Sequence, residues 1–389
     1  MISLILKRII PDHVSPEDPT VRNRCGTLSG GIGIALNLLL CAGKLIAGIA
    51  TGAISVTADA LNNLSDAGSS AATLIGFRLA GQKPDPDHPF GHGRFEYLTG
   101  LVVSMLILLV GFELGKSSVE KILYPEDVRF SWLAAGILIA SMCVKLWMFF
   151  FNRALSRAIQ SAALKATSAD SLSDCVATAA VLTGLILSQT TQLQVDGWLG
   201  LAVAIFILRA GILSIRDTLD PLLGQAPDPA LVKGVQDTVL SHREIVAIHD
   251  LVIHDYGPGR RMLSLHAEVP ADSDILEAHD VIDHIERELK DKYALEAVIH
   301  MDPIVMGDAE TDRLRELVST RAKEIHPDIT IHDFRMTAGP LRTNLIFDMV
   351  VPFACPFSES QLKSRISAAM KEEGEHFFTV VEIDRPYTH

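Results

Sequence analysis

The sequence predicts a membrane domain of six transmembrane helices, followed by a cytoplasmic α+β ferredoxin-like domain that occurs twice. Hydrophobic residues make up 48% of the 389 residues, and they are concentrated in residues 28–220. Apolar stretches of about 20 residues are long enough to cross a bilayer. Residues 225–306 have the mixed composition of a soluble domain, and their pattern recurs in residues 307–389.

Six stretches have the length and composition of membrane spans, and we expect a cytoplasmic segment, 1–27, before them. The second and fifth stretches are the least hydrophobic, which favours positions inside the helix bundle. Lys and Arg are concentrated in the amino-terminal segment and in the second and fourth loops, so we expect both termini in the cytoplasm and the chain in the cell's inner membrane. The expected spans are 28–51, 53–79, 97–121, 131–153, 165–189 and 196–216.

The soluble part is predicted to be an α-β-β-α-β unit and a second copy of it. In the first copy we expect helices at 229–242 and 274–292 and strands at 246–255, 261–270 and 296–302. Three segments of the first copy recur in order in the second, which indicates duplication. The pairs are Ile248-His-Asp with Ile331-His-Asp, Ala267-Glu-Val-Pro270 with Met349-Val-Val-Pro352, and Val298-Ile-His-Met-Asp302 with Val380-Val-Glu-Ile-Asp384.

Charge and cysteine usage exclude several classes of protein. A net charge of −13 argues against a nucleic-acid partner, because such proteins need a basic face. The five cysteines form no CxxC pair, and we interpret those near apolar helices as small buried side chains. We expect no prosthetic group. The sequence contains no HExxH motif, which argues against an intramembrane metallo-enzyme.

Polar residues at four-residue spacing lie inside two of the predicted membrane helices. Asn62 and Asp66 share one helix face, as do Asp170 and Asp174. A carboxylate inside a membrane helix costs roughly 2.5–3.5 kcal/mol, and such residues usually mark an ion or proton path. Hydrogen bonding between helices is the alternative, but it does not need three carboxylates. We therefore predict a four-ligand oxygen site for a divalent cation.

Two further groups consist of side chains that commonly bind metal ions. In the second loop, Asp85, His88 and His92 have the spacing of an Asp/His site, although a loop rich in Pro and Gly often carries histidine without such a role. In the first soluble copy, histidines on neighbouring strands and on the helix above them could form a binding cluster. Taken singly, each is more often a surface or packed residue. The candidates are His249, His266, His279, His300 and Asp302.

Three motifs, in this order, resemble those of the cation diffusion facilitator family: Ala58–Asp66, His88–Arg94 with Glu96, and Ala169–Asp174. The resemblance implies a homodimeric metal/proton antiporter, with its transport site at the intramembrane residues, a loop site, and a metal site in the cytoplasmic dimer interface. Metal at that interface would regulate transport. A transport site without histidine resembles the manganese-exporting branch.

The ligand chemistry also favours Mn²⁺ as the transported ion. Oxygen ligands suit Mg²⁺, Ca²⁺ and Mn²⁺, whereas Zn²⁺ prefers His and Cys. Mg²⁺ dehydrates reluctantly and Ca²⁺ requires six to eight oxygens. We therefore expect Mn²⁺/H⁺ antiport by alternating access rather than enzymatic activity. Export of Zn²⁺, Fe²⁺, Co²⁺ or Cd²⁺, a non-transporting membrane metal sensor, and an intramembrane metallo-enzyme are the alternatives.

The second soluble copy replaces imidazoles with carboxylates at the corresponding positions. These positions are His332, Asp348, Glu382 and Asp384. The replacement is compatible with a degenerate site or one for a harder cation, but we favour a packing duplicate that binds no metal.

Overall fold

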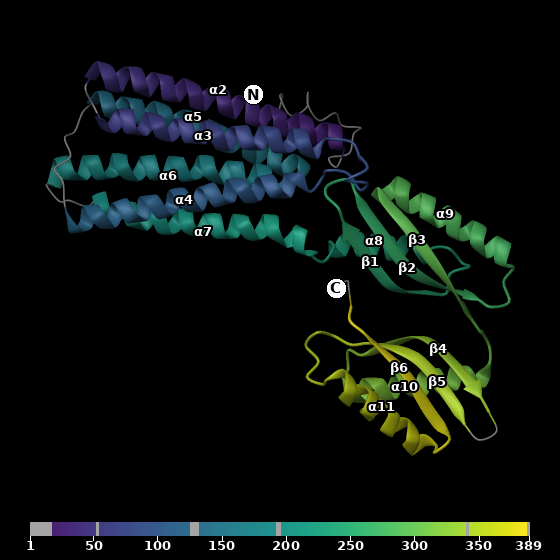
Figure 1. The fold of residues 1–389 in the computed structure, drawn as a ribbon. Helices are drawn as coiled ribbons and strands as arrows, with labels where there is room; N and C mark the ends of the chain where they lie inside the picture. The colour runs from purple at the N-terminus through teal and green to yellow at the C-terminus, as the bar shows by residue number, and fades with distance from the viewer. Residues whose placement is uncertain (1–17, 52–53, 125–131, 192–195, 340–341, 387–389) are drawn as a thin grey trace. The chain divides into compact units, whose positions relative to one another are not determined.

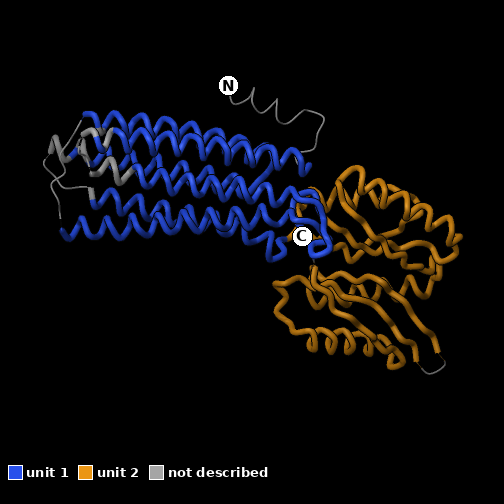
Figure 2. Tube along the Cα trace, turned by 45° about the horizontal axis from the view of Figure 1, so that its top comes forward, with its two compact units in different colours: residues 1–225, 255–260 blue, residues 226–254, 261–389 orange. Residues whose placement is uncertain are grey.

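The computed structural model describes residues 18–386 except 52–53, 125–131, 192–195 and 340–341. It divides into two units, one of residues 1–225 with 255–260 and one of residues 226–254 with 261–389 (Figure 2). Residues 1–17 of the expected amino-terminal segment lie outside the described residues.

Six long helices form the described part of the first unit, and they confirm the predicted membrane architecture (Figure 1). The first begins inside the segment that was expected to precede it. Pro19 suits the first turn of a helix, and the Asp18 carboxylate accepts a hydrogen bond from the Thr20 backbone N–H at 2.7 Å. The helices are α2 (Pro19–Thr51), α3 (Ile54–Ala80), α4 (Phe95–Leu123), α5 (Trp132–Ile159), α6 (Ala162–Thr191) and α7 (Asp196–Leu223).

The two polar helices differ from the other four in composition, and one of them, α6, lies inside the bundle. Helices α2, α4, α5 and α7 each contain a segment long and apolar enough to cross a membrane, whereas the described parts of α3 and α6 fall short of that criterion. Helix α6 contacts α3, α4, α5 and α7, which places it inside the bundle. Large apolar side chains such as Leu39, Ile46 and Phe112 are exposed, as expected for a surface that faces lipid.

Small residues allow α2 and α3 to approach closely. A Cβ atom added at Gly26 would lie 1.9 Å from Cγ of Phe77, and one added at Gly30 would lie 2.6 Å from Cβ of Leu74. Helices in membranes associate largely through such close packing, because lipid tails are as apolar as the side chains they would replace.

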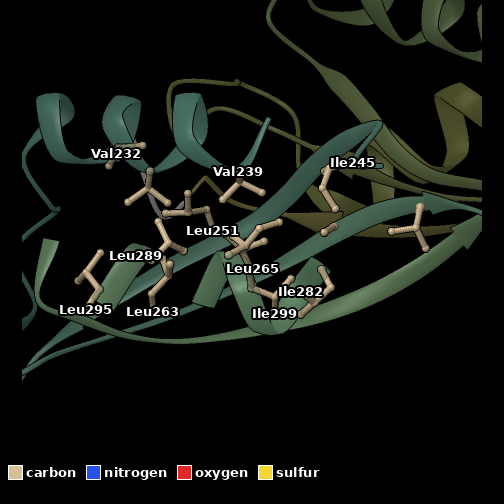
Figure 3. Packing of buried hydrophobic residues seen from close by; sticks show 14 residues of the cluster. Val232, Val239, Ile245, Leu251, Leu263, Leu265, Ile282, Leu289, Leu295 and Ile299 are labelled. Atoms are coloured by element: carbon tan, nitrogen blue, oxygen red, sulfur yellow. The ribbon is translucent and has the colours of Figure 1, made fainter. Parts of the chain in front are cut away.

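The first soluble copy, here called the first repeat (residues 229–304), forms the predicted α-β-β-α-β unit. Its sheet has the order β1-β2-β3, and β2 and β3 run parallel with His266 opposite His300. Residues of both helices and of the strands form the core, among them Val239, Leu265 and Leu289 (Figure 3). The elements are α8 (Pro229–Val239), β1 (Ala247–Asp255), β2 (Arg261–Pro270), α9 (Ile275–Tyr293) and β3 (Leu295–Ile304).

The second soluble copy, the second repeat (residues 309–384), has the same element order and sheet order. Strands β5 and β6 are parallel with Asp348 opposite Glu382, which corresponds to His266 opposite His300 in the first repeat. The structure thus confirms the predicted duplication. The elements are α10 (Ala309–Ile325), β4 (Thr330–Ala338), β5 (Thr343–Val350), α11 (Glu359–Glu373) and β6 (Phe377–Asp384).

A left-handed residue interrupts the first strand of each repeat at the same position. Asp250 has a φ of 50° and Asp333 a φ of 49°, a conformation that Asp adopts more readily than most residues. In β4 the pairing register shifts between His332 and Arg335, as expected at a bulge. Side chains on both sides of the interruption, such as Ile248 and Leu251, pack into the core, so His249 between them lies on the face without helices.

We predict that Gly26→Ala lowers the melting temperature of the purified protein in detergent. The new methyl group would overlap the Phe77 ring, and such overpacking costs about 1–3 kcal/mol. Gly43→Ala on the same helix is the control, because no atom lies within 4 Å of the added Cβ. Equal melting temperatures for the two variants would show that α2 and α3 do not pack this closely.

Candidate metal centre

Three carboxylates from two helices converge inside the membrane unit. Asp66 of α3 and Asp170 and Asp174 of α6 each offer one oxygen, and these oxygens lie within 4.8 Å of one another. Asp66 is buried and the other two side chains are half-buried. We call this group the intramembrane triad. Its oxygen atoms are the donors that hard divalent cations prefer.

Lys145 of α5 lies against the intramembrane triad, although it was not among the residues predicted from the sequence. Its ammonium group donates hydrogen bonds to Asp66 Oδ2 at 2.7 Å and to Asp174 Oδ2 at 2.6 Å, and its side chain is only 4% exposed. A lone lysine in an otherwise apolar span was the available signal, since ionisable residues at that depth normally have a counter-charge.

The neighbouring amide differs from the one predicted. Asn62 is exposed on α3, whereas Asn63 is buried and donates to Asp66 Oδ2 at 3.5 Å. Asn63 also accepts a hydrogen bond from the ammonium group of Lys44 at 2.6 Å. Asn63 is therefore the amide beside the triad within this chain, and Asn62 stays a prediction.

The loop residues Asp85, His88 and His92 come together between α3 and α4. Each offers one atom within 4.8 Å of the others, and the two imidazole rings are 4.6 Å apart. The His88 backbone N–H donates to the Asp85 carboxylate at 2.7 Å and holds the pKa of that group below its usual value. Nε2 of His92 lies 3.4 Å from the Asp85 carboxylate, so it is the ring nitrogen that faces the group.

In the first repeat, the face without helices brings His249, His266 and Asp302 together, and we call them the first triad. The Asp302 carboxylate lies 2.8 Å from Nδ1 of His266 and 3.2 Å from Nε2 of His249. Burial lowers the pKa of His249, but the hydrogen bond with Asp250 and the charges of Asp250 and Asp302 outweigh it and raise that pKa above its usual value.

The other two predicted ligands of this cluster lie further out. His300 is exposed, with its Nε2 3.3 Å from Asp302 and its ring 4.7 Å from that of His266. His279 lies on α9, 3.8 Å from Asp283, and belongs to none of the metal-capable groups found among the described residues. It stays a prediction.

The second repeat contains a corresponding group of His332, Asp348 and Asp384, which we call the second triad. Glu382, the fourth position considered in the sequence, is exposed and lies outside this group.

Comparison with known protein families accounts for most of the chain. Residues 32–223 match the cation efflux transmembrane domain, and residues 227–304 match the cytoplasmic domain of cation efflux proteins. An uncharacterized transporter of Methanocaldococcus jannaschii is 30% identical over 70% of this chain and 96% of its own length. The chain belongs to the cation efflux family. This confirms the resemblance to the cation diffusion facilitators, whose members are transporters of divalent cations.

Two relatives have names that state a metal or a function. Manganese efflux system protein MneS of Bacillus subtilis is 28% identical over 70% of this chain and 94% of its own length. Cation-efflux pump FieF of Salmonella newport is 27% identical over 67% of this chain and 87% of its own length. Both family matches end before the second repeat begins, so that repeat is an addition to the matched domains.

We predict that Asp250→Asn lowers the pKa of His249. The substitution removes the negative charge that favours the imidazolium, while burial continues to oppose it. Because a metal binds the neutral imidazole, loss of metal from the first triad on acidification should then occur at lower pH. Histidine NMR titration of metal-free protein measures the pKa directly.

The matched control for this titration is Asp333→Asn. Asp333 occupies the equivalent left-handed position, which Asn also tolerates, but its carboxylate accepts a hydrogen bond from Arg335 at 2.6 Å. An unchanged pKa of His249 in Asp250→Asn would contradict the assignment of its cause.

Proposed function

We propose that this cation efflux protein exchanges cytoplasmic Mn²⁺ for external protons across the cell's inner membrane. The observation that carries the proposal is the convergence of Asp66, Asp170 and Asp174 inside the helix bundle. In this proposal a rocking motion of the helices exposes the triad to each side in turn. Both termini face the cytoplasm, and the cytoplasmic domains hold two chains together as a homodimer in the bilayer.

The donor set supports Mn²⁺ over Zn²⁺. The triad offers oxygen ligands, with the amide of Asn63 beside it, and no histidine belongs to it. Zn²⁺ binds most tightly to imidazole and thiolate, while carboxylates suit Mn²⁺. The similarity to the relative named a manganese efflux protein supports the same choice, whereas the relative named a cation-efflux pump has no metal in its name, so Zn²⁺ and Fe²⁺ remain the alternatives to test.

Charge balance supports exchange with protons. Three ionised carboxylates and the Lys145 ammonium carry a formal charge of −2, which one divalent cation neutralises. Two protons neutralise it equally well. In a surrounding of low dielectric constant the uncompensated charge is costly, so departure of the metal favours proton uptake. We propose that two protons return for each metal ion exported.

Lys145 takes part in this exchange as an internal competitor of the metal. Its ammonium group binds Asp66 and Asp174, two of the oxygens that a metal would need. Metal entry therefore requires this group to give up these two hydrogen bonds while it stays beside the triad, and metal release allows it to make them again. The re-formed hydrogen bonds stabilise the protein without metal, so that the empty site can turn from one side of the membrane to the other.

The two other predicted groups have supporting roles in this proposal. Asp85, His88 and His92 bind a cation that holds the loop between α3 and α4 in place. A cation at the first triad regulates transport by favouring one arrangement of the cytoplasmic domains.

In proteoliposomes with an imposed pH gradient, we expect uptake of Mn²⁺ that dissipates the gradient, and slower uptake of Zn²⁺. Asp66→Asn and Asp174→Asn should each abolish the flux, because they remove ligand charge without changing side-chain shape. Fluorescent metal and pH indicators inside the vesicles measure both ions at once.

Asp87→Asn is the control for these variants, because Asp87 is an exposed carboxylate outside the metal-capable groups. Zn²⁺ uptake equal to that of Mn²⁺ would refute selection by oxygen ligands but not transport. Metal flux without proton movement would refute antiport, and absence of any flux would favour the metal sensor.

We expect Lys145→Met to lower the Mn²⁺ concentration that gives half-maximal transport and to lower the maximal rate. Removing the competing ammonium frees two carboxylates for the metal, but it leaves the empty site with an additional uncompensated charge. Transport rates measured against Mn²⁺ concentration separate these two effects.

The matched variant for Lys145→Met is Lys165→Met, which breaks the half-exposed ion pair with Asp217 on the surface of the unit. Weaker Mn²⁺ binding in Lys145→Met would show that the lysine positions the carboxylates instead of competing with the metal.

A further inference from the structure

A histidine of the second repeat is buried on the face of its sheet that has no helices. The His332 side chain is 9% exposed, and both of its ring nitrogens are buried without a hydrogen-bond partner among the described residues. Buried polar atoms in this state are rare in native structures, and each calls for an explanation. A metal ligand is one such explanation, because a coordinated nitrogen is satisfied.

The residue that covers His332 comes from the first repeat. The rings of His249 and His332, which are equivalent positions of the duplication, stack with centroids 4.3 Å apart and an angle of 26°. His249 is also 8% exposed, and its Nε2 has no hydrogen bond of normal geometry among the described residues. The two imidazoles therefore bury each other at the point where the repeats meet.

Carboxylates from both repeats surround Nε2 of His332. It lies 3.6 Å from Asp384 Oδ2 of its own repeat and 3.8 Å from Asp250 Oδ1 of the first repeat. Asp348 completes the second triad, with one atom of each member within 4.8 Å of the others. These separations are too long for hydrogen bonds. They are close to the distance between two donor atoms that bind the same cation, which is roughly 3–3.5 Å when each metal–ligand bond is about 2.1 Å.

The local charges also favour a cation. Burial raises the pKa of Asp348 and of Asp384, and the neighbouring charge of Asp250 raises that of Asp384 further. Arg335, the nearest basic residue along β4, donates its hydrogen bond to Asp333 instead. A divalent cation would offset the mutual repulsion of the three carboxylates around His332.

We propose that His332, Asp348 and Asp384, together with Asp250 of the first repeat, bind a divalent cation that links the two repeats of one chain. One imidazole with carboxylates suits Mn²⁺ or Fe²⁺ better than Zn²⁺. Only residues 305–308 connect β3 to α10, and so short a connection keeps the two halves of the site at high effective concentration. The second repeat would then be a metal-binding clamp on the first rather than a packing duplicate.

The test is a titration of the purified full-length protein with Mn²⁺ in detergent at about pH 8, which is above the pKa of an unperturbed imidazole. Electron paramagnetic resonance of free Mn²⁺ gives the number of bound ions. We expect Asp384→Asn and Asp348→Asn each to bind one ion fewer per chain than wild type. The matched control, Glu382→Gln on the same sheet face, should bind as many as wild type.

A second pair of variants tests the link between the repeats. Asp250→Asn should lower the affinity for this one ion by roughly 10- to 100-fold, whereas Asp333→Asn should leave it unchanged. Retained binding at the other sites shows that each variant is folded, and the assay does not depend on transport. The proposal is overturned if Asp348→Asn and Asp384→Asn bind as many ions as wild type, or if Asp250→Asn binds like Asp333→Asn.

Discussion

The balance of charge around three buried carboxylates is the constraint on which the membrane unit depends. Asp66, Asp170 and Asp174 lie where water cannot solvate them freely, so their repulsion must be offset by a cation. Lys145 of α5 supplies one positive charge, so two more positive charges are needed to neutralise the three carboxylates. The same constraint explains why the described parts of α3 and α6 are less hydrophobic than the other helices, since the site occupies part of their length.

The soluble repeats solve a different problem, which is to place ligands on one face of a small sheet. The helices cover one face and form the core there, so polar side chains gather on the other. The histidine that precedes the left-handed Asp250 or Asp333 lies on that face in each repeat. Duplication then presents two such faces in one chain, and the stacking of His249 on His332 brings their ligands together.

Much of the architecture could be predicted because it depends on local periodicity. The spacing of Asp170 and Asp174 requires only a helix to put both on one side, and parallel pairing puts His266 opposite His300. The amide beside the triad could not be predicted so well. Asn62 and Asn63 are adjacent, and the rotation of α3 against its neighbours buries Asn63. Lys145 was missed because its counter-charges lie on other helices, far away in the sequence.

The sequence by itself determined the number of long helices, the duplication, and the kinds of donor atom, since each follows from composition or from short-range spacing. Only the tertiary structure decided which donors share a site. It placed an ammonium group among the carboxylates, left the His279 side chain exposed on α9, and joined His332 to Asp250 of the other repeat. Contacts between distant segments depend on how packed elements are rotated against each other, and no local pattern in the chain specifies that rotation.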